Sequence, residues 1–172
     1  MVNMSAYGLA ETGGATPDFV ADRPMHHIVD VIRFGGRYDF GAMYQALNVL
    51  VCRHQMLRTV FKESRGQTLQ MVLSKIDAGL PECDLSVLPK EEREEAWRQL
   101  VHEQSRRAFD LTGAPLYRVM MIHLSPHEHR LLLTIHHLIA DEWCTETIQQ
   151  EMRQLYESFS SDRKSPLAAL PI

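Results

Sequence analysis

The chain has 172 residues, of which 45% are hydrophobic and 23% are charged, and its net charge is −4. This length and composition are typical of one globular domain with a substantial core. The weak negative charge provides no attraction for nucleic acid or an anionic membrane, and no apolar run approaches the roughly 20 residues that span a bilayer. We therefore expect neither a nucleic-acid-binding protein nor a membrane protein.

The cysteines and the first residues indicate the compartment. Cys52, Cys83 and Cys144 are odd in number and follow no disulfide pattern, which favours reduced thiols. The opening stretch MVNMSAYGLAETGG lacks the basic and apolar regions of a secretory signal. Both features predict a cytoplasmic protein.

In chain order, the first part shows a leading segment, a strand and a helix. Residues 1–26 are small, polar and Gly-rich without a clear period, which predicts a flexible leading segment. Residues 27–34 alternate in side-chain character and are rich in β-branched residues, which predicts a strand. Asp39 can cap a helix over 40–54, where apolar side chains recur on one face.

Two hairpins and two helices follow. The predicted elements are a hairpin turn at Arg65-Gly66, an irregular loop over 74–88, a charged helix from Pro89 to about 108, strands over 116–124 and 129–139, and a helix over about 143–160. The Pro-rich tail over 161–172 is typical of a linker. The order of elements predicts an α/β (α+β) two-layer sandwich, a mixed sheet with helices packed on it.

The stretch TIHHLIADEW, residues 134–143, carries the candidate chemistry. It places His136 and His137 at the end of an apolar run, followed by Asp141 and Glu142. All four could ligate zinc, but adjacent residues on a strand point to opposite faces, which disfavours a metal site. No metal is therefore expected.

Two other interpretations concern single side chains. Cys144 lies at a predicted helix start, where a thiolate is favoured, yet a small buried residue is the simpler explanation. A histidine that ends a core strand is often only a hydrogen-bonded core residue. Here Asp141, across a turn, can orient an imidazole or anchor the loop, which favours a single-histidine acid–base site.

At these residues the sequence resembles the condensation domains of nonribosomal peptide synthetases. HHLIADE is similar to their HHxxxDG motif, and YQALNVLVCRHQMLRTVF (44–61) is similar to their ALNALVARHEALRTRF segment. FDLTGAPLYRVMMIHLSPHEHRLLLTIHHLIADEW (109–143) and LYESFSSDRKSPLAALPI also resemble family stretches. The blocks occur in the family's order and cover about residues 27 to 172.

The resemblance implies a chloramphenicol acetyltransferase-like fold, in which two similar halves form a V around a tunnel. Residues 27–160 would be the N-terminal subdomain, and 161–172 would lead toward a C-terminal subdomain that this sequence lacks. Carrier protein domains would deliver thioesters on phosphopantetheine to the two tunnel mouths. An amine would attack the thioester and form an amide, or an alcohol an ester, in a nonribosomal peptide or hybrid polyketide pathway. The domain itself would bind no cofactor.

The resemblance also assigns roles to residues. His137 would be the catalytic residue, as general base or by positioning the amine, while His136 shapes the motif. Asp141 would be structural and pair with Arg58 of the LRT block. A tightly paired carboxylate is a poor base, whereas an imidazole of ordinary pKa can accept a proton at neutral pH. Glu142 and Trp143 would border the substrate tunnel.

Three departures leave rival functions open. Glu142 replaces the motif's glycine, the family's opening LSxxQ-like segment is not found in residues 1–26, and the sequence corresponds to one half of a two-half domain. The first rival is a non-catalytic platform that binds carrier proteins or partner enzymes. The others are an acyltransferase that uses free coenzyme A thioesters, and a metal-binding domain.

Overall fold

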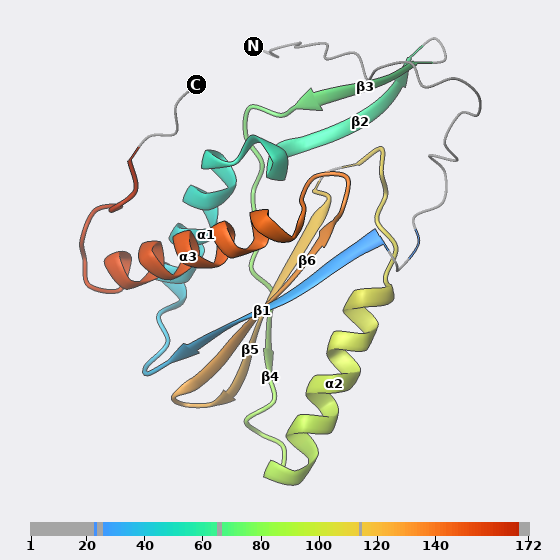
Figure 1. Ribbon diagram of the computed structural model, residues 1–172. Helices are drawn as coiled ribbons and strands as arrows, with labels where there is room; N and C mark the ends of the chain where they lie inside the picture. Colours follow the sequence, from blue (N-terminus) through green and yellow to red (C-terminus); the bar gives the residue numbers. More distant parts are fainter. Residues whose placement is uncertain (1–22, 24–25, 65–66, 114, 169–172) are drawn as a thin grey trace.

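The computed structural model describes residues 23, 26–64, 67–113 and 115–168 (Figure 1). The turn expected at Arg65-Gly66 lies outside these residues. So do most of the leading segment and the last four residues of the expected linker.

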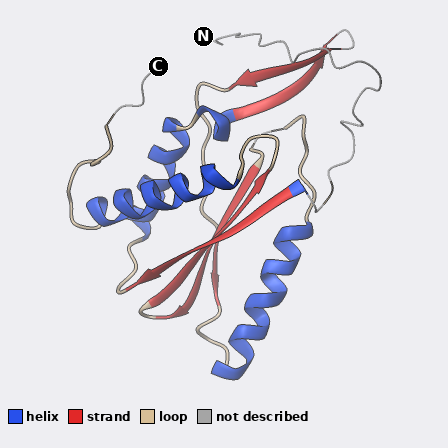
Figure 2. Ribbon diagram, viewed as in Figure 1, coloured by secondary structure: helices blue, strands red, loops and turns tan. Residues whose placement is uncertain are grey.

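A mixed four-stranded sheet forms the centre of the molecule (Figures 1 and 2). Its order is β1-β6-β5-β4, where β1–β6 and β6–β5 are antiparallel pairs and β5–β4 is parallel. The strands are β1 His27–Gly35, β4 Glu82–Asp84, β5 Tyr117–Ser125 and β6 Glu128–His136. A separate two-stranded sheet consists of β2 Thr59–Ser64 and β3 Gln67–Val72, after the short 3-10 helix η2 Gln55–Arg58.

Three helices complete the described fold: α1 Phe40–Arg53, α2 Lys90–Arg106 and α3 Glu142–Phe159. The expected cap of α1 is present, because Asp39 Oδ1 accepts from the Ala42 N–H at 3.0 Å. Between α1 and α3, Glu151 accepts from Arg53 Nε at 2.9 Å and from His54 Nε2 at 2.6 Å. These bonds join the two helices into one layer.

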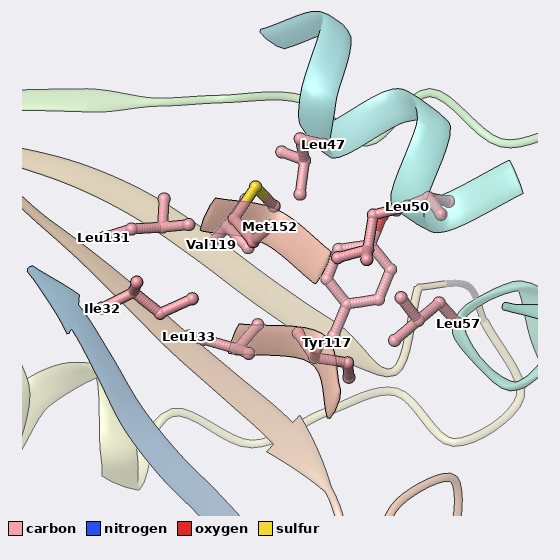
Figure 3. A pocket seen from close by; sticks show the side chains of 11 residues that line it. Ile32, Leu47, Leu50, Leu57, Tyr117, Val119, Leu131, Leu133 and Met152 are labelled. Atoms are coloured by element: carbon pink, nitrogen blue, oxygen red, sulfur yellow. The ribbon is translucent and has the colours of Figure 1, made fainter. Parts of the chain in front are cut away.

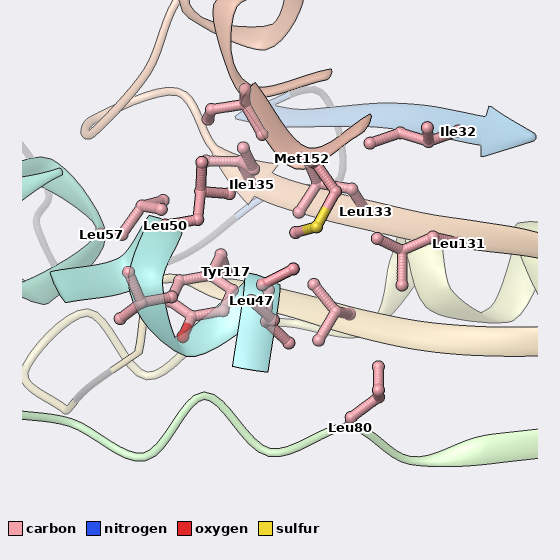
Figure 4. Packing of buried hydrophobic residues seen from close by; sticks show 14 of the residues in the cluster. Ile32, Leu47, Leu50, Leu57, Leu80, Tyr117, Leu131, Leu133, Ile135 and Met152 are labelled. Atoms are coloured by element: carbon pink, nitrogen blue, oxygen red, sulfur yellow. The ribbon is translucent and has the colours of Figure 1, made fainter. Parts of the chain in front are cut away.

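The core lies on both faces of the sheet. Leu131, Leu133 and Ile135 of β6 pack toward α1 and α3 (Figure 4). On the other face of the sheet, Leu132 packs with Trp97 of α2. The mixed sheet with helices packed on it is confirmed. The expected arrangement had two layers, the sheet and one layer of helices. The structure adds a further layer, because α2 packs on the face of the sheet opposite α1 and α3. The nearly continuous apolar run of β6 suits a strand buried on both sides.

Strand β4 was not predicted, since residues 74–88 were expected to form an irregular loop. It has three residues, two of them acidic, and its sequence has no strand pattern. It forms because the buried β5 offers a free edge, along which Glu82–Asp84 pairs in parallel. Within the described part of the chain, none of the helices combines the length and apolar character needed to cross a bilayer.

A small apolar cavity of about 10 Å³ lies between α1, α3 and the sheet (Figure 3). Its lining includes Leu47, Tyr117, Leu131 and Met152. This volume is about that of one water-sized sphere. The cavity is therefore a packing gap in the core and has no room for a substrate.

Candidate active site at the end of strand β6

His136 and His137 occupy different environments, because β6 ends between them. His136 is the last strand residue and pairs with His27 of β1, and its side chain is 1% exposed. His137 begins a turn and is exposed. Its backbone N–H donates to the His26 carbonyl at 2.8 Å, which continues the β1–β6 register by one residue. The turn thus presents His137 at the surface from a fixed backbone position.

The imidazole rings of three histidines meet at this point. The ring centroids of His26 and His137 are 4.6 Å apart with an interplanar angle of 23°, and those of His136 and His137 are 4.9 Å apart. The expectation that His136 and His137 point to opposite faces is therefore wrong. It assumed that the strand continues through both residues, whereas β6 ends at His136.

His136 is held by the turn that follows it. Its Nδ1 accepts from the Leu138 N–H at 3.1 Å, and its backbone carbonyl accepts from the Ile139 N–H at 3.1 Å. The ring also makes edge contacts with Phe109 and His27, at centroid distances of 6.0 and 5.9 Å. These contacts fix the start of the turn that carries His137.

Asp141 caps the helix that follows the turn. Its Oδ1 accepts from the Cys144 N–H at 2.9 Å, the arrangement of a helix N-cap. The side chain therefore fixes where α3 begins and so limits the path of the loop from His137.

Within the described residues, Arg58 does not form the expected ion pair with Asp141. Its guanidinium donates to three backbone carbonyls, those of Val51, Cys52 and Leu73. The first two close the end of α1, and the third belongs to the segment after β3. Arg58 thus joins α1 to the two-stranded sheet.

Replacing Asp141 should separate capping from charge. We expect Asp141→Ala to lower the free energy of unfolding by roughly 0.5–2 kcal/mol, the usual cost of losing an N-cap. Asp141→Asn retains a capping oxygen, so it should lose much less. Urea denaturation of both variants measures the difference. Equal losses would show that the negative charge, and not the cap, matters at this position.

The side chains of Glu142 and Trp143 lie outside the described residues, so their expected place beside the tunnel stays a prediction. The backbone is described: Glu142 is the first residue of α3. A helical residue has negative φ, which every L-amino acid adopts easily. The backbone at the motif's glycine position therefore accommodates glutamate without strain.

Cys144 is half-buried in the first turn of α3. The pKa of its thiol is raised above the ordinary value. A backbone hydrogen bond at Asp141 lowers this pKa, but burial and the neighbouring Asp141 carboxylate raise it by more. The thiolate that a nucleophile needs is thus disfavoured. Cys52, Cys83 and Cys144 are all free thiols.

A second histidine pair lies at the other end of β6 and does not join the site. His129 is seven residues before His136, which is about 23 Å along a strand. His129 Nε2 donates to the Gly36 carbonyl at 3.2 Å, and its Nδ1 lies 2.8 Å from His123 Nδ1. His129 can accept from His123 only while neutral. Burial is the largest cause of its lowered pKa, and the charge of His123 adds to it.

This pair should make stability depend on pH. The unfolded state takes up a proton on His129 as the pH falls below about 6.5, while the folded state resists it. The contribution of His129 to the free energy of unfolding is therefore complete above that pH. It is lost as the pH falls through the lower pKa that His129 has in the folded protein. We expect His129→Gln to lose less unfolding free energy than wild type between pH 7.5 and 5.5. Parallel losses in urea titrations would exclude His129 as the cause.

Sequence reasoning missed His26, which it assigned to the flexible leading segment. The structure stacks this side chain against His137. A signal was present: His26-His27 is a second adjacent pair at the start of a predicted strand. Only the pairing of β1 with β6, however, reveals that the two pairs lie opposite each other.

Comparison with known proteins gives a consistent result. The family model described as the condensation domain matches residues 22–171. Phosphinothricin tripeptide synthetase PhsB from Streptomyces viridochromogenes is 33% identical over 141 residues, which is 82% of this chain and 12% of that protein. A linear gramicidin synthase protein from Brevibacillus parabrevis is 32% identical over 151 residues, which is 88% of this chain and 2% of that protein. The chain thus spans a small part of each of these curated relatives.

Solved structures agree in fold. SgcC5 from Streptomyces globisporus is 28% identical with a TM-score of 0.76, over 86% of this chain and 33% of that one. The X-domain from teicoplanin biosynthesis is 25% identical with a TM-score of 0.73, over 90% of this chain and 32% of that one. The chain therefore corresponds to about one third of each solved chain.

Proposed function

Because the chain belongs to the condensation-domain family, we propose that it supplies the active-site histidine, His137, of an acyltransferase in a nonribosomal peptide or hybrid polyketide assembly line. The proposed reaction joins an acyl group to an amine, or to an alcohol. Carrier protein domains bring the substrates as phosphopantetheine thioesters, and the condensation domain binds no cofactor of its own.

One observation carries the proposal: His137 is an exposed imidazole on a backbone fixed at both ends. On one side its N–H is bonded to the His26 carbonyl, and on the other Asp141 caps α3. An exposed ring can reach a substrate, and a fixed backbone limits its positions. Both properties suit a group that must accept a proton at a set place.

The chemistry needs few groups. The amine nitrogen attacks the thioester carbonyl, a C–N bond forms, and the C–S bond breaks to release the donor's thiol. The nitrogen loses a proton on the way, and a neutral imidazole at His137 accepts it and passes it to the departing sulfur. The thioester is already activated, so no step requires a metal or nucleotide.

The rest of the tunnel would come from a C-terminal subdomain. The chain matches about one third of each solved relative, and the small gap between α1, α3 and the sheet has no room for a substrate. An open half-site would leave the reacting groups poorly positioned and exposed to water. We therefore expect full activity only when both halves are present.

A second candidate function is a non-catalytic platform for a partner enzyme. It is favoured by the likeness to the teicoplanin X-domain, which also has a solved structure in complex with OxyB. In that case the histidines would be part of the fold without chemistry.

A product assay separates the two functions. The complete domain, with both halves, is incubated with carrier-bound acyl thioesters and a panel of amines and alcohols, and products are identified by mass spectrometry. Condensed product from carrier-bound donors supports the acyltransferase. Product formed only from free coenzyme A thioesters would show that the domain is an acyltransferase that does not use carrier-bound donors. No product while both carrier proteins bind would favour the platform.

A further inference from the structure

The antiparallel register brings two histidine pairs together at one end of the sheet. His27 pairs with His136 in the ladder, and the His137 N–H bonded to the His26 carbonyl extends it. The His27 ring turns toward α2, where its Nδ1 donates to the Ser105 carbonyl at 2.6 Å. The other three histidines each offer one ring nitrogen, and these nitrogens lie within 4.8 Å of one another.

We propose that His26, His136 and His137 form a binding site for one divalent transition-metal ion of the zinc class. Neutral imidazole nitrogens are preferred ligands of such ions, whereas magnesium and calcium prefer oxygen. Three histidine ligands leave a fourth position open to water or to an added ligand. Since His137 is exposed and His26 half-buried, an ion reaches the cluster from solvent.

The distances need only a modest adjustment. With zinc–nitrogen bonds of about 2.0–2.1 Å, two nitrogens of a tetrahedral site lie roughly 3.3 Å apart. The nitrogens of the cluster lie within 4.8 Å, so rotation of the two accessible rings, His26 and His137, can close the gap. The buried His136 is the fixed member of the site.

One contact opposes tight binding. His136 Nδ1 accepts from the Leu138 N–H, and this bond leaves the proton of the neutral ring on Nε2. Ligation through either nitrogen therefore breaks or rearranges the bond to Leu138. The site should therefore bind its ion reversibly and more weakly than the structural zinc sites that hold a fold together.

Metal binding would have a consequence at the proposed active site. A ring nitrogen of His137 that ligates zinc cannot accept a proton from a substrate amine. Zinc should therefore inhibit product formation, and a chelator should restore it. This consequence rests on the proposed function, whereas the metal site itself does not.

The binding test uses the chain without a histidine tag. Zinc binding is measured by calorimetry, and cobalt(II) is added separately, because its visible absorption reports tetrahedral nitrogen ligation. We expect one ion per chain. Removing a residue that only supports a metal ligand weakens binding by roughly 10- to 100-fold. His26→Ala and His137→Ala each remove a ligand itself, so each should weaken binding by at least this much. The matched control is His102→Ala, the same change at an exposed histidine of α2, which should bind as wild type.

Several outcomes would overturn the site. These are no saturable binding at submillimolar zinc, binding that neither variant weakens, or a cobalt spectrum of six-coordinate type. Far-UV circular dichroism shows whether each variant is folded, and the exposed His137 provides a test that stays valid if His26→Ala unfolds.

The activity arm separates this proposal from the proposed function. In the complete domain, zinc should inhibit at concentrations near its dissociation constant, and His26→Ala should shift that inhibition to higher zinc. Cobalt and zinc binding as expected, in a protein that makes no product, would retain the metal site and reject the acyltransferase. Activity that saturating zinc leaves unchanged would overturn the inhibitory role.

Discussion

Replacing His137 with alanine is expected to lower product formation by the complete domain by roughly 10²- to 10⁴-fold, the usual contribution of a positioned general base. The substitution removes the imidazole and leaves the backbone bond to the His26 carbonyl in place. Because His137 is exposed, the change should alter stability little. Product is measured by mass spectrometry at saturating carrier-bound substrates.

The control for this prediction is again His102→Ala, on the exposed side of α2. It should form product at the wild-type rate. If His137→Ala were equally active while remaining folded, His137 would not be the base, and the platform function would become the better proposal. A loss in both variants would indicate a defect unrelated to the site.

Leu131→Ala should destabilise the fold strongly, with a loss of about 2–5 kcal/mol in the free energy of unfolding. Leu131 lies in the middle of β6, is 1% exposed, and lines the small core cavity (Figure 3). Truncation removes buried methyl groups and enlarges a gap that rigid strands on both sides cannot close. Equilibrium unfolding in urea measures the loss.

Val87→Ala is the contrasting apolar truncation. Val87 is 77% exposed in the loop before α2, so its loss should stay within about 0.5 kcal/mol. A loss below about 1 kcal/mol for Leu131→Ala would contradict the position of β6 at the centre of the core. Such a small loss would also contradict the geometry of the site, because β6 carries His136 and leads to His137.

Local patterns in the sequence were sufficient for most elements. The alternating, β-branched residues of 27–34 predicted the first strand, and apolar runs predicted the β5–β6 hairpin. These patterns suffice because side-chain periodicity is a property of the strand itself. Asp39 marked the start of α1 through a hydrogen bond three residues away. The HHLIADE motif identified His137 as the candidate catalytic residue, because all residues of the motif are contiguous in the chain.

Long-range contacts decided the rest. Strand β4 exists because β5 has a free edge, and α2 covers the second face because β6 is apolar on both sides. The partners of Arg58 are backbone carbonyls, and a sequence does not reveal where carbonyl groups point.

The sequence by itself thus determined the family motif, the helices and the principal strands, because these depend on residues near one another in the chain. Only the tertiary structure decided that His26 stacks on His137 and completes a three-histidine cluster. The physical reason is register: the pairing of β1 with β6 places two distant histidine pairs face to face, and the end of β6 at His136 turns His137 toward them.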